Sequence, residues 1–171
     1  MFKKTVFSLS LLVFLLLGST AAVADGGGDT IVYPVENPVF SVTFPEGWKT
    51  EMEEDIVHAA PKDESIYLGI WALEDAENLD AALDAVDEAV SSLVKDLDVG
   101  EADSVVVNGI QFFTVDGTGK DEDGSTVSVS VALFSPDGTQ IFILLYFGTP
   151  QAEDAHKDEL VEIIKSLNEE E

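Results

Sequence analysis

Two histidines, His58 and His156, are the side chains best suited to acid–base or metal chemistry in this sequence. An imidazole changes its charge near neutral pH and is also the commonest metal ligand. His58 falls on a predicted strand and His156 on the first turns of the last predicted helix, and nothing in their spacing indicates a shared site. The sequence contains no G-x-S-x-G nucleophile elbow. We therefore interpret both histidines as surface or rim residues, with a hydrolase-type site in a groove between helix and sheet as the alternative.

An acidic loop at Asp121–Ser125 is the second candidate for chemistry. It reads Asp-Glu-Asp-Gly-Ser and resembles part of a calcium loop, in which oxygen ligands flank a turn-forming glycine. The full ligand spacing is missing, and Ser130 stands six residues after Gly124, where a bidentate Glu would be needed. Because Asp-Gly is also a turn signal, the pattern favours a hairpin loop. Asp121 and Asp123 remain the candidate ligands of a weak calcium site, and no other cofactor is expected.

The composition excludes several other kinds of chemistry. The chain has no cysteine, so it cannot use a thiolate nucleophile, a disulfide or a Cys-ligated metal. The glycine-rich segment Gly117–Lys120 precedes no predicted helix, so it cannot direct a helix N-terminus at a phosphate. We expect a protein that is not an enzyme.

Negative charge dominates the surface. The 171 residues include 34 Asp and Glu against 8 Lys and Arg, for a formal net charge of −26. Nucleic acids and anionic membranes both require Lys and Arg, so neither is an expected partner. A protein partner or divalent cations fit this charge. A salt-adapted acidic protein with no specific ligand is the alternative.

The N-terminus reads as a signal peptide over residues 1–24. Lys3 and Lys4 precede an apolar run from Val6 to Leu17, and Ala22–Ala24 supplies a small-residue cleavage site. Export to the periplasm or the extracellular space is therefore expected, with no membrane contact beyond the cleaved peptide. Loss of the two leader lysines would change the net charge from −26 to −28. We expect a flexible tether at 25–30, one domain at 31–168 and an acidic tail at 169–171.

A four-strand antiparallel meander between Asp103 and Phe147 is the strongest structural signal. Asn108-Gly109 predicts its first hairpin, because both turn residues must adopt positive φ. Pro136 and Gly138 predict the last turn. The segment Ile141–Phe147 is apolar on both faces, so it should lie inside the sheet with cover on each side.

The remaining segments supply further strands and two helices. Period-two alternation predicts a strand at Phe40–Phe44, and Ile56–Ala60 forms a hairpin with Ser65–Leu73. A stripe of apolar residues predicts a helix from Asn78 or Asp80 to about Leu97. Thr149 caps a final helix. The fold class is α+β, with an antiparallel sheet of about six to seven strands packed with two main helices.

Two residues within these strands have a structural and a functional interpretation. Trp48 is interpreted as a core residue at a sheet corner, with ligand stacking as the alternative. Gly69 is interpreted as a glycine that weakens its strand, with close approach of a backbone or ligand as the alternative.

The segment Phe40–Trp48, Phe-Ser-Val-Thr-Phe-Pro-Glu-Gly-Trp, resembles the opening of PsbP-like domains. That family includes the photosystem II extrinsic protein PsbP and exported bacterial relatives. Asn108-Gly109 and the closing Ile163–Leu167 also match its order of elements. The resemblance implies an antiparallel sheet between helices (an α/β/α sandwich) and an exported, non-enzymatic accessory or binding protein. It transfers no catalytic, cation-binding or photosystem-binding residue, because the matching positions are packing and turn residues.

Overall fold

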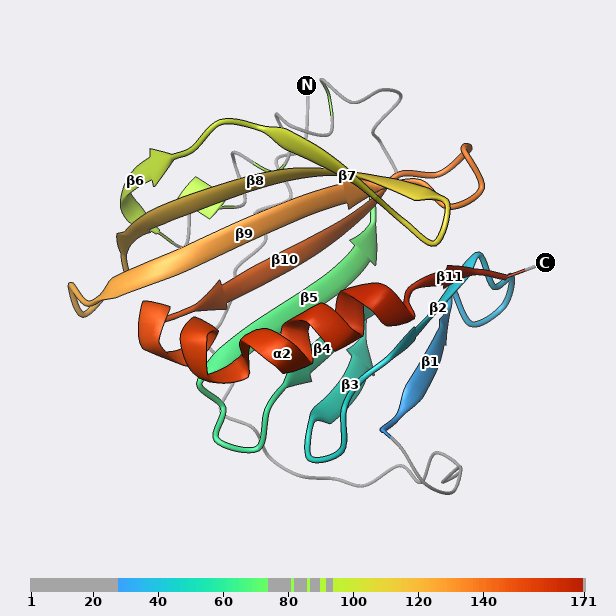
Figure 1. Cartoon of the computed structure of the whole chain (residues 1–171), viewed down its shortest axis with the longest axis horizontal. Coiled ribbons are helices and arrows are strands. Elements are labelled where there is room, and N and C mark those ends of the chain that lie inside the picture. Colours follow the sequence, from blue (N-terminus) through green and yellow to red (C-terminus); the bar gives the residue numbers. More distant parts are fainter. Residues whose placement is uncertain (1–27, 74–80, 82–85, 87–89, 92–93, 171) are drawn as a thin grey trace, which may run out of the picture.

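The structure is a computed structural model that describes residues 28–73, 81, 86, 90–91 and 94–170. Within these residues it contains an antiparallel eight-stranded sheet, a separate three-stranded sheet and one helix with defined bounds (Figure 1). The elements in chain order are β1 (Thr30–Tyr33), β2 (Phe40–Thr43), β3 (Lys49–Glu53), β4 (Ile56–Ala60), β5 (Ile66–Ala72), β6 (Lys95–Val99), β7 (Asp103–Val107), β8 (Ile110–Lys120), β9 (Thr126–Phe134), β10 (Phe142–Gly148), α2 (Pro150–Ser166) and β11 (Asn168–Glu169).

The predicted meander forms the larger part of the main sheet. The strand order of the main sheet is β3-β4-β5-β10-β9-β8-β6, and β7 also pairs with β8. Asn108, at φ +50°, and Gly109, at φ +85°, connect β7 to β8 as their turn chemistry requires. The apolar β10 lies between β5 and β9, and nearly all its residues are buried. The prediction that this segment lies inside the sheet is confirmed.

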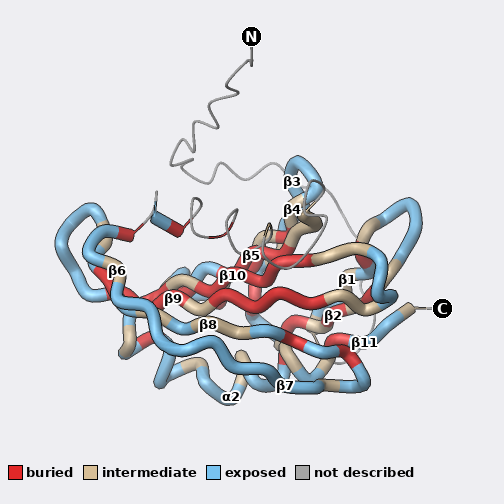
Figure 2. Tube along the Cα trace, turned by 90° about the horizontal axis from the view of Figure 1, so that it is seen from above, coloured by how far each residue is buried: buried red, intermediate tan, exposed pale blue. Residues whose placement is uncertain are grey.

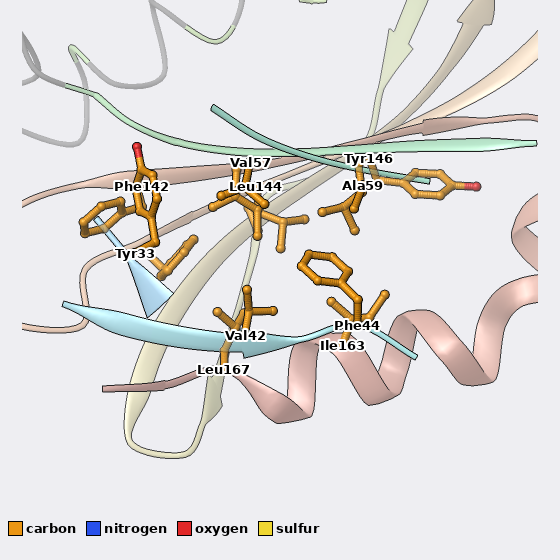
Figure 3. Close-up of a cluster of buried hydrophobic side chains, with 14 of the residues drawn as sticks. Tyr33, Val42, Phe44, Val57, Ala59, Phe142, Leu144, Tyr146, Ile163 and Leu167 are labelled. Atoms are coloured by element: carbon orange, nitrogen blue, oxygen red, sulfur yellow. The ribbon is translucent and has the colours of Figure 1, made fainter. Parts of the chain in front are cut away.

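One face of the main sheet packs against β2 and α2. Phe44 and Ile163 face Ala59 in this core (Figure 3). Val42 and Leu167 lie opposite Val57 and Leu144 in the same core (Figure 3). Phe142 stands at one end of the cluster in edge contact with Phe40, their ring centroids 5.1 Å apart. We call this face of the sheet the α2 face.

The opposite face holds a second apolar core. Alternation along β9 directs Val127, Val129, Val131 and Leu133 to this side. Figure 2 shows the buried residues concentrated along β9, β10 and β5, whereas β6 and β7 at the edge are largely exposed. Other members of this core are Val86, Val90, Val94, Ile143 and Leu145.

The predicted numbers of helices and strands require correction. Two main helices, and hence the α/β/α sandwich, are not supported. Most of the expected helix from Asn78 or Asp80 lies outside the described residues, and its expected end at Lys95–Leu97 belongs to β6 instead. The described residues form eleven strands rather than six to seven: eight belong to the main sheet, and β1, β2 and β11 form a sheet of their own.

Both ends of the domain extend further than predicted. Gly28 to Thr30 fall within the expected tether, yet Thr30 pairs with Thr43 and Asp29 accepts a hydrogen bond from the Phe44 amide. At the other end, Glu169 of the expected tail pairs with Phe40. These backbone groups extend the small sheet because strand pairing satisfies donors and acceptors that would otherwise need water.

The second meander strand is longer than predicted, since β8 continues through Gly117–Lys120. Gly119 explains the extension. A Cβ on this residue would lie 2.8 Å from the Lys95 carbonyl oxygen, so its absence lets β6 approach β8 closely. The glycine-rich segment is therefore part of the sheet.

The final helix begins as the sequence predicts. The Thr149 hydroxyl accepts a hydrogen bond from the Ala152 amide, and Pro150 occupies the first turn. At the far end, the Asn108 side chain donates to the carbonyls of Lys165 and Leu167, each at 2.8 Å. The hairpin residue that makes the β7–β8 turn thus also fixes the C-terminus of α2.

Candidate functional site

His58 lies on β4 and contacts an aromatic side chain. Its Nδ1 is 2.7 Å from the Tyr67 hydroxyl. Burial lowers the pKa of His58, while the carboxylates of Glu53 and Glu51 act in the opposite direction. Tyr67 also covers Gly69, whose added Cβ would lie 2.9 Å from the tyrosine hydroxyl oxygen. Side chains of the same strand therefore occupy the space that a ligand would need above Gly69.

His156 lies on α2 within a different group of side chains. Its Nδ1 is 2.7 Å from Glu159 Oε2, and its Nε2 is 3.3 Å from Asp63 Oδ2. Trp48 Nε1 donates to the same Glu159 oxygen at 2.9 Å. The hydrogen bond with Glu159 is the main cause that raises the pKa of His156. Trp48 is 7% exposed, as expected of a core residue, and the cluster ties α2 to the β2–β3 and β4–β5 connections.

The stability contributed by His156 should depend on pH. Its pKa is raised by folding, so its charged pairing should stabilise the fold fully below about pH 6.5 and be lost as the pH rises through the raised pKa. We expect His156→Gln to lower the free energy of unfolding by on the order of 1 kcal/mol at pH 6, and by less at pH 8. Urea denaturation at both pH values measures this difference.

His58→Gln is the matched control for that experiment. Folding lowers the pKa of His58, so the wild-type imidazole should become destabilising as the pH falls through about 6.5. The two variants should therefore show opposite pH trends relative to the wild type. Equal trends would contradict the assignment of a charged His156.

Asp121 and Asp123 both lie in the connection between β8 and β9. The Asp121 side chain accepts a hydrogen bond from the Ser125 amide at 2.8 Å, and the Gly124 amide donates to the Asp121 carbonyl. These are the contacts of a hairpin turn. Among the described residues, no group of three or more His, Cys, Asp or Glu side chains is arranged to hold a metal ion. A calcium site here stays a prediction.

A concave site lies elsewhere, at one end of the α2 face. Register places side chains of successive strands in rows across the sheet. One row is Asp116 on β8, Ser130 on β9 and Tyr146 on β10. The next row is Asp98 on β6, Thr118 on β8 and Ser128 on β9. Farther along the same face the row is Phe112, Phe134 and Phe142, so the face changes from aromatic to polar.

These polar side chains line a groove of about 400 Å³ beside the first turn of α2, to which Glu153 contributes. The β8–β9 hairpin extends past the start of α2, which leaves this end of the sheet beside the helix (Figure 1). Ser130 donates a hydrogen bond to the Asp116 carboxylate. No Lys, Arg or His lines the groove among the described residues. We call the site formed by Asp98, Asp116, Thr118, Ser128, Ser130, Tyr146 and Glu153 the acidic groove.

Tyr146 closes the inner side of the acidic groove. The residue is 5% exposed, and its hydroxyl points away from the apolar cluster (Figure 3). This hydroxyl is the only buried side-chain polar atom of the described residues that has no hydrogen-bond partner. Burial, assisted by the nearby Glu153 carboxylate, raises the pKa of Tyr146 to about 12. The phenol therefore stays neutral and keeps its proton at physiological pH.

The sequence did not indicate the acidic groove, and it gave no sign that His58 and His156 share a site. The structure does not bring His58 and His156 together, since each belongs to a separate group of contacts. Ser128 and Ser130 share one side of β9 by alternation, and their small polar side chains alone do not indicate a site. Their strand partners became visible only with the register of β8 and β10.

The fold of this chain is shared with known proteins, although its sequence is distant from them. No family model matches the chain, and no curated protein matches it. The solution structure of cyanobacterial PsbP (CyanoP) from Synechocystis sp. PCC 6803 matches with a TM-score of 0.59 and 14% identity, covering 90% of this chain and 99% of that one.

LpqN, a protein involved in cell envelope biogenesis of Mycobacterium tuberculosis, matches with a TM-score of 0.57 and 11% identity. The match covers 84% of this chain and 91% of LpqN. The resemblance to PsbP-like domains inferred from Phe40–Trp48 is therefore confirmed at the level of the fold. In the described part of the chain, no helix has the length and apolar character needed to span a membrane.

Proposed function

We propose that this protein is an exported, non-enzymatic accessory module that binds a basic protein partner through its acidic surface, with the acidic groove as the docking point. The observation that carries the proposal is the groove itself. Three carboxylates, Asp98, Asp116 and Glu153, line it together with hydroxyl groups, and its lining contains no basic residue from the described part of the chain. Such a concentration of one charge favours association with cationic groups and speeds their encounter.

Two further observations support a binding role over an enzymatic one. The two histidines are engaged in contacts with Tyr67 and with Glu159 and Asp63, so neither stands free beside a nucleophile. The fold is that of CyanoP and of LpqN, a protein involved in cell envelope biogenesis. Export of this chain agrees with that setting and with the signal-peptide pattern of residues 1–24.

The test is cross-linking of the mature protein in its native envelope fraction. The groove variant is the triple change Asp98→Asn, Asp116→Asn and Glu153→Gln. The control is a triple change of exposed carboxylates that do not line the groove, Glu46→Gln, Glu51→Gln and Glu162→Gln. We expect one basic partner to be captured by the wild type and the control and lost with the groove variant. Equal loss with both variants would reduce the effect to net charge and contradict the proposal.

Addition of calcium separates a cation function from a protein-binding one. If Asp121 and Asp123 hold calcium, titration calorimetry at millimolar calcium should give heat that Asp121→Asn abolishes. Partner capture that is unchanged by calcium and by Asp121→Asn would assign the function to the acidic groove alone.

A further inference from the structure

The buried Tyr146 hydroxyl is a polar group that the fold leaves unsatisfied. A buried hydroxyl without a partner lowers stability relative to one that is hydrogen-bonded. Tyr146 is a lining residue of the acidic groove, so an occupant of the groove that reaches its hydroxyl is the natural source of the missing partner. Orphaned groups of this kind are rare in folded proteins and call for an explanation.

The backbone beside this hydroxyl makes room for the Tyr146 side chain itself. Gly148 follows Tyr146 on the same face of β10, and a Cβ on this glycine would lie 2.9 Å from the tyrosine hydroxyl oxygen. Neighbouring strands are about 4.8 Å apart, so the backbones of Asp116 and Tyr146, two strands apart, are about 10 Å from each other, with Ser130 between them.

The chemistry of the lining selects the kind of ligand. Carboxylates come from three separate elements, β6, β8 and α2, and the hydroxyls can all accept hydrogen bonds. Anions would be repelled. A hard metal ion requires several converging oxygen ligands, and the described residues contain no such group of acidic side chains. An ammonium carries one positive charge and three donors, which matches spaced carboxylates and a neutral phenol oxygen.

We propose that the acidic groove binds a primary ammonium group, with Asp116 and Glu153 supplying charge and the Tyr146 hydroxyl a hydrogen bond. This inference rests on the proposed function and names the chemical group that the groove recognises. The group has two possible sources, a lysine side chain of the partner or a free small amine. The volume of about 400 Å³ accommodates either.

The test is an NMR titration of the mature protein with n-butylamine, with the backbone amides of β8, β9 and β10 as the readout. Two matched probes define the specificity. n-Butanol has the same shape without charge, and tetramethylammonium has the charge without N–H donors. We expect millimolar binding of n-butylamine that shifts the amides around Ser130 and Tyr146, with at least tenfold weaker binding of the other probes. Equal shifts with all three probes would overturn the proposal.

Tyr146→Phe tests the hydroxyl directly. Because the hydroxyl has no partner within the fold, we expect its removal to leave the melting temperature unchanged or slightly raised. Binding of n-butylamine should weaken about fivefold, and Asp116→Asn should weaken it further. Glu162→Gln removes one carboxylate from α2 outside the groove and should bind as the wild type does. Unchanged affinity in Tyr146→Phe would overturn the proposal.

A short blocked peptide with one lysine distinguishes the two sources. Peptide binding with equal or higher affinity than n-butylamine supports a lysine of the partner. Binding of the free amine alone supports a small-molecule ligand; it upholds this inference and contradicts the proposed function. If neither probe binds while partner capture still depends on the groove carboxylates, the ammonium inference fails and the proposed function stands.

Discussion

Replacement of Phe142 by alanine should lower the free energy of unfolding by about 3–5 kcal/mol, the cost typical of a phenylalanine removed from a packed core. Phe142 is fully buried in the central strand β10. Its ring contacts Phe40, Phe134 and Tyr33, with centroids 5.1, 5.6 and 6.0 Å away. The change would leave a cavity where the large and the small sheets meet, and these rigid rings cannot collapse into it.

Urea denaturation followed by tryptophan fluorescence measures the loss. Phe113→Ala is the matched control, because Phe113 is 39% exposed on a strand of the same sheet and should change stability much less. Domains of this size have only about 5–15 kcal/mol of stability, so we expect the alanine variant to unfold at a much lower urea concentration than the wild type. Phe142→Leu keeps most of the volume and should lose about 1–2 kcal/mol. Equal losses at Phe113 and Phe142 would contradict the position of the aromatic core.

The elements that were predicted correctly are those whose local chemistry allows one conformation. Asn108-Gly109 strongly favours a tight hairpin, and Thr149-Pro150 strongly favours the start of a helix. The apolar run of β10 had to be shielded on both faces, which fixed its central place. These signals act over a few residues and do not depend on the rest of the chain.

The end of the predicted first helix shows the opposite case. Leu93, Val94 and Leu97 fit a helical stripe by their spacing, yet Lys95–Val99 is strand β6. Positive φ at Asp96 and the irregular register opposite Lys120 accompany the change. The cause is a contact distant in sequence, since Gly119 on β8 opens the space that β6 enters. Periodicity within one segment does not contain that information.

The acidic groove was hidden for a related reason. Its lining comes from β6, β8, β9, β10 and α2, and no two of its carboxylates are neighbours in the sequence. In a chain with 34 acidic residues, Asp116 and Glu153 have no local feature that distinguishes them from the others. Only the strand register brings Asp116, Ser130 and Tyr146 into one row. The single signal available in the sequence was the small polar side of β9.

Truncation of Ile163 should separate the stability of the domain from binding in the groove. Ile163 is fully buried where α2 packs beside Phe44, so Ile163→Ala should lower the free energy of unfolding by about 2–5 kcal/mol (Figure 3). Val161→Ala is the matched control on the same helix. Val161 is 41% exposed, and its change should alter stability by no more than about 0.5 kcal/mol.

The same variant makes a second prediction for the acidic groove. Glu153 lies ten residues before Ile163, about 15 Å along the helix axis, and Thr149 caps that first turn independently. Folded Ile163→Ala should therefore bind n-butylamine with the affinity of the wild type, although urea unfolds it at lower concentration. The two measurements use one sample, with the titration performed well below the unfolding transition. A parallel loss of affinity would mean that α2 moves as a whole when packing at Ile163 is lost. Glu153 would then be held in place by the distant core rather than by the capped first turn.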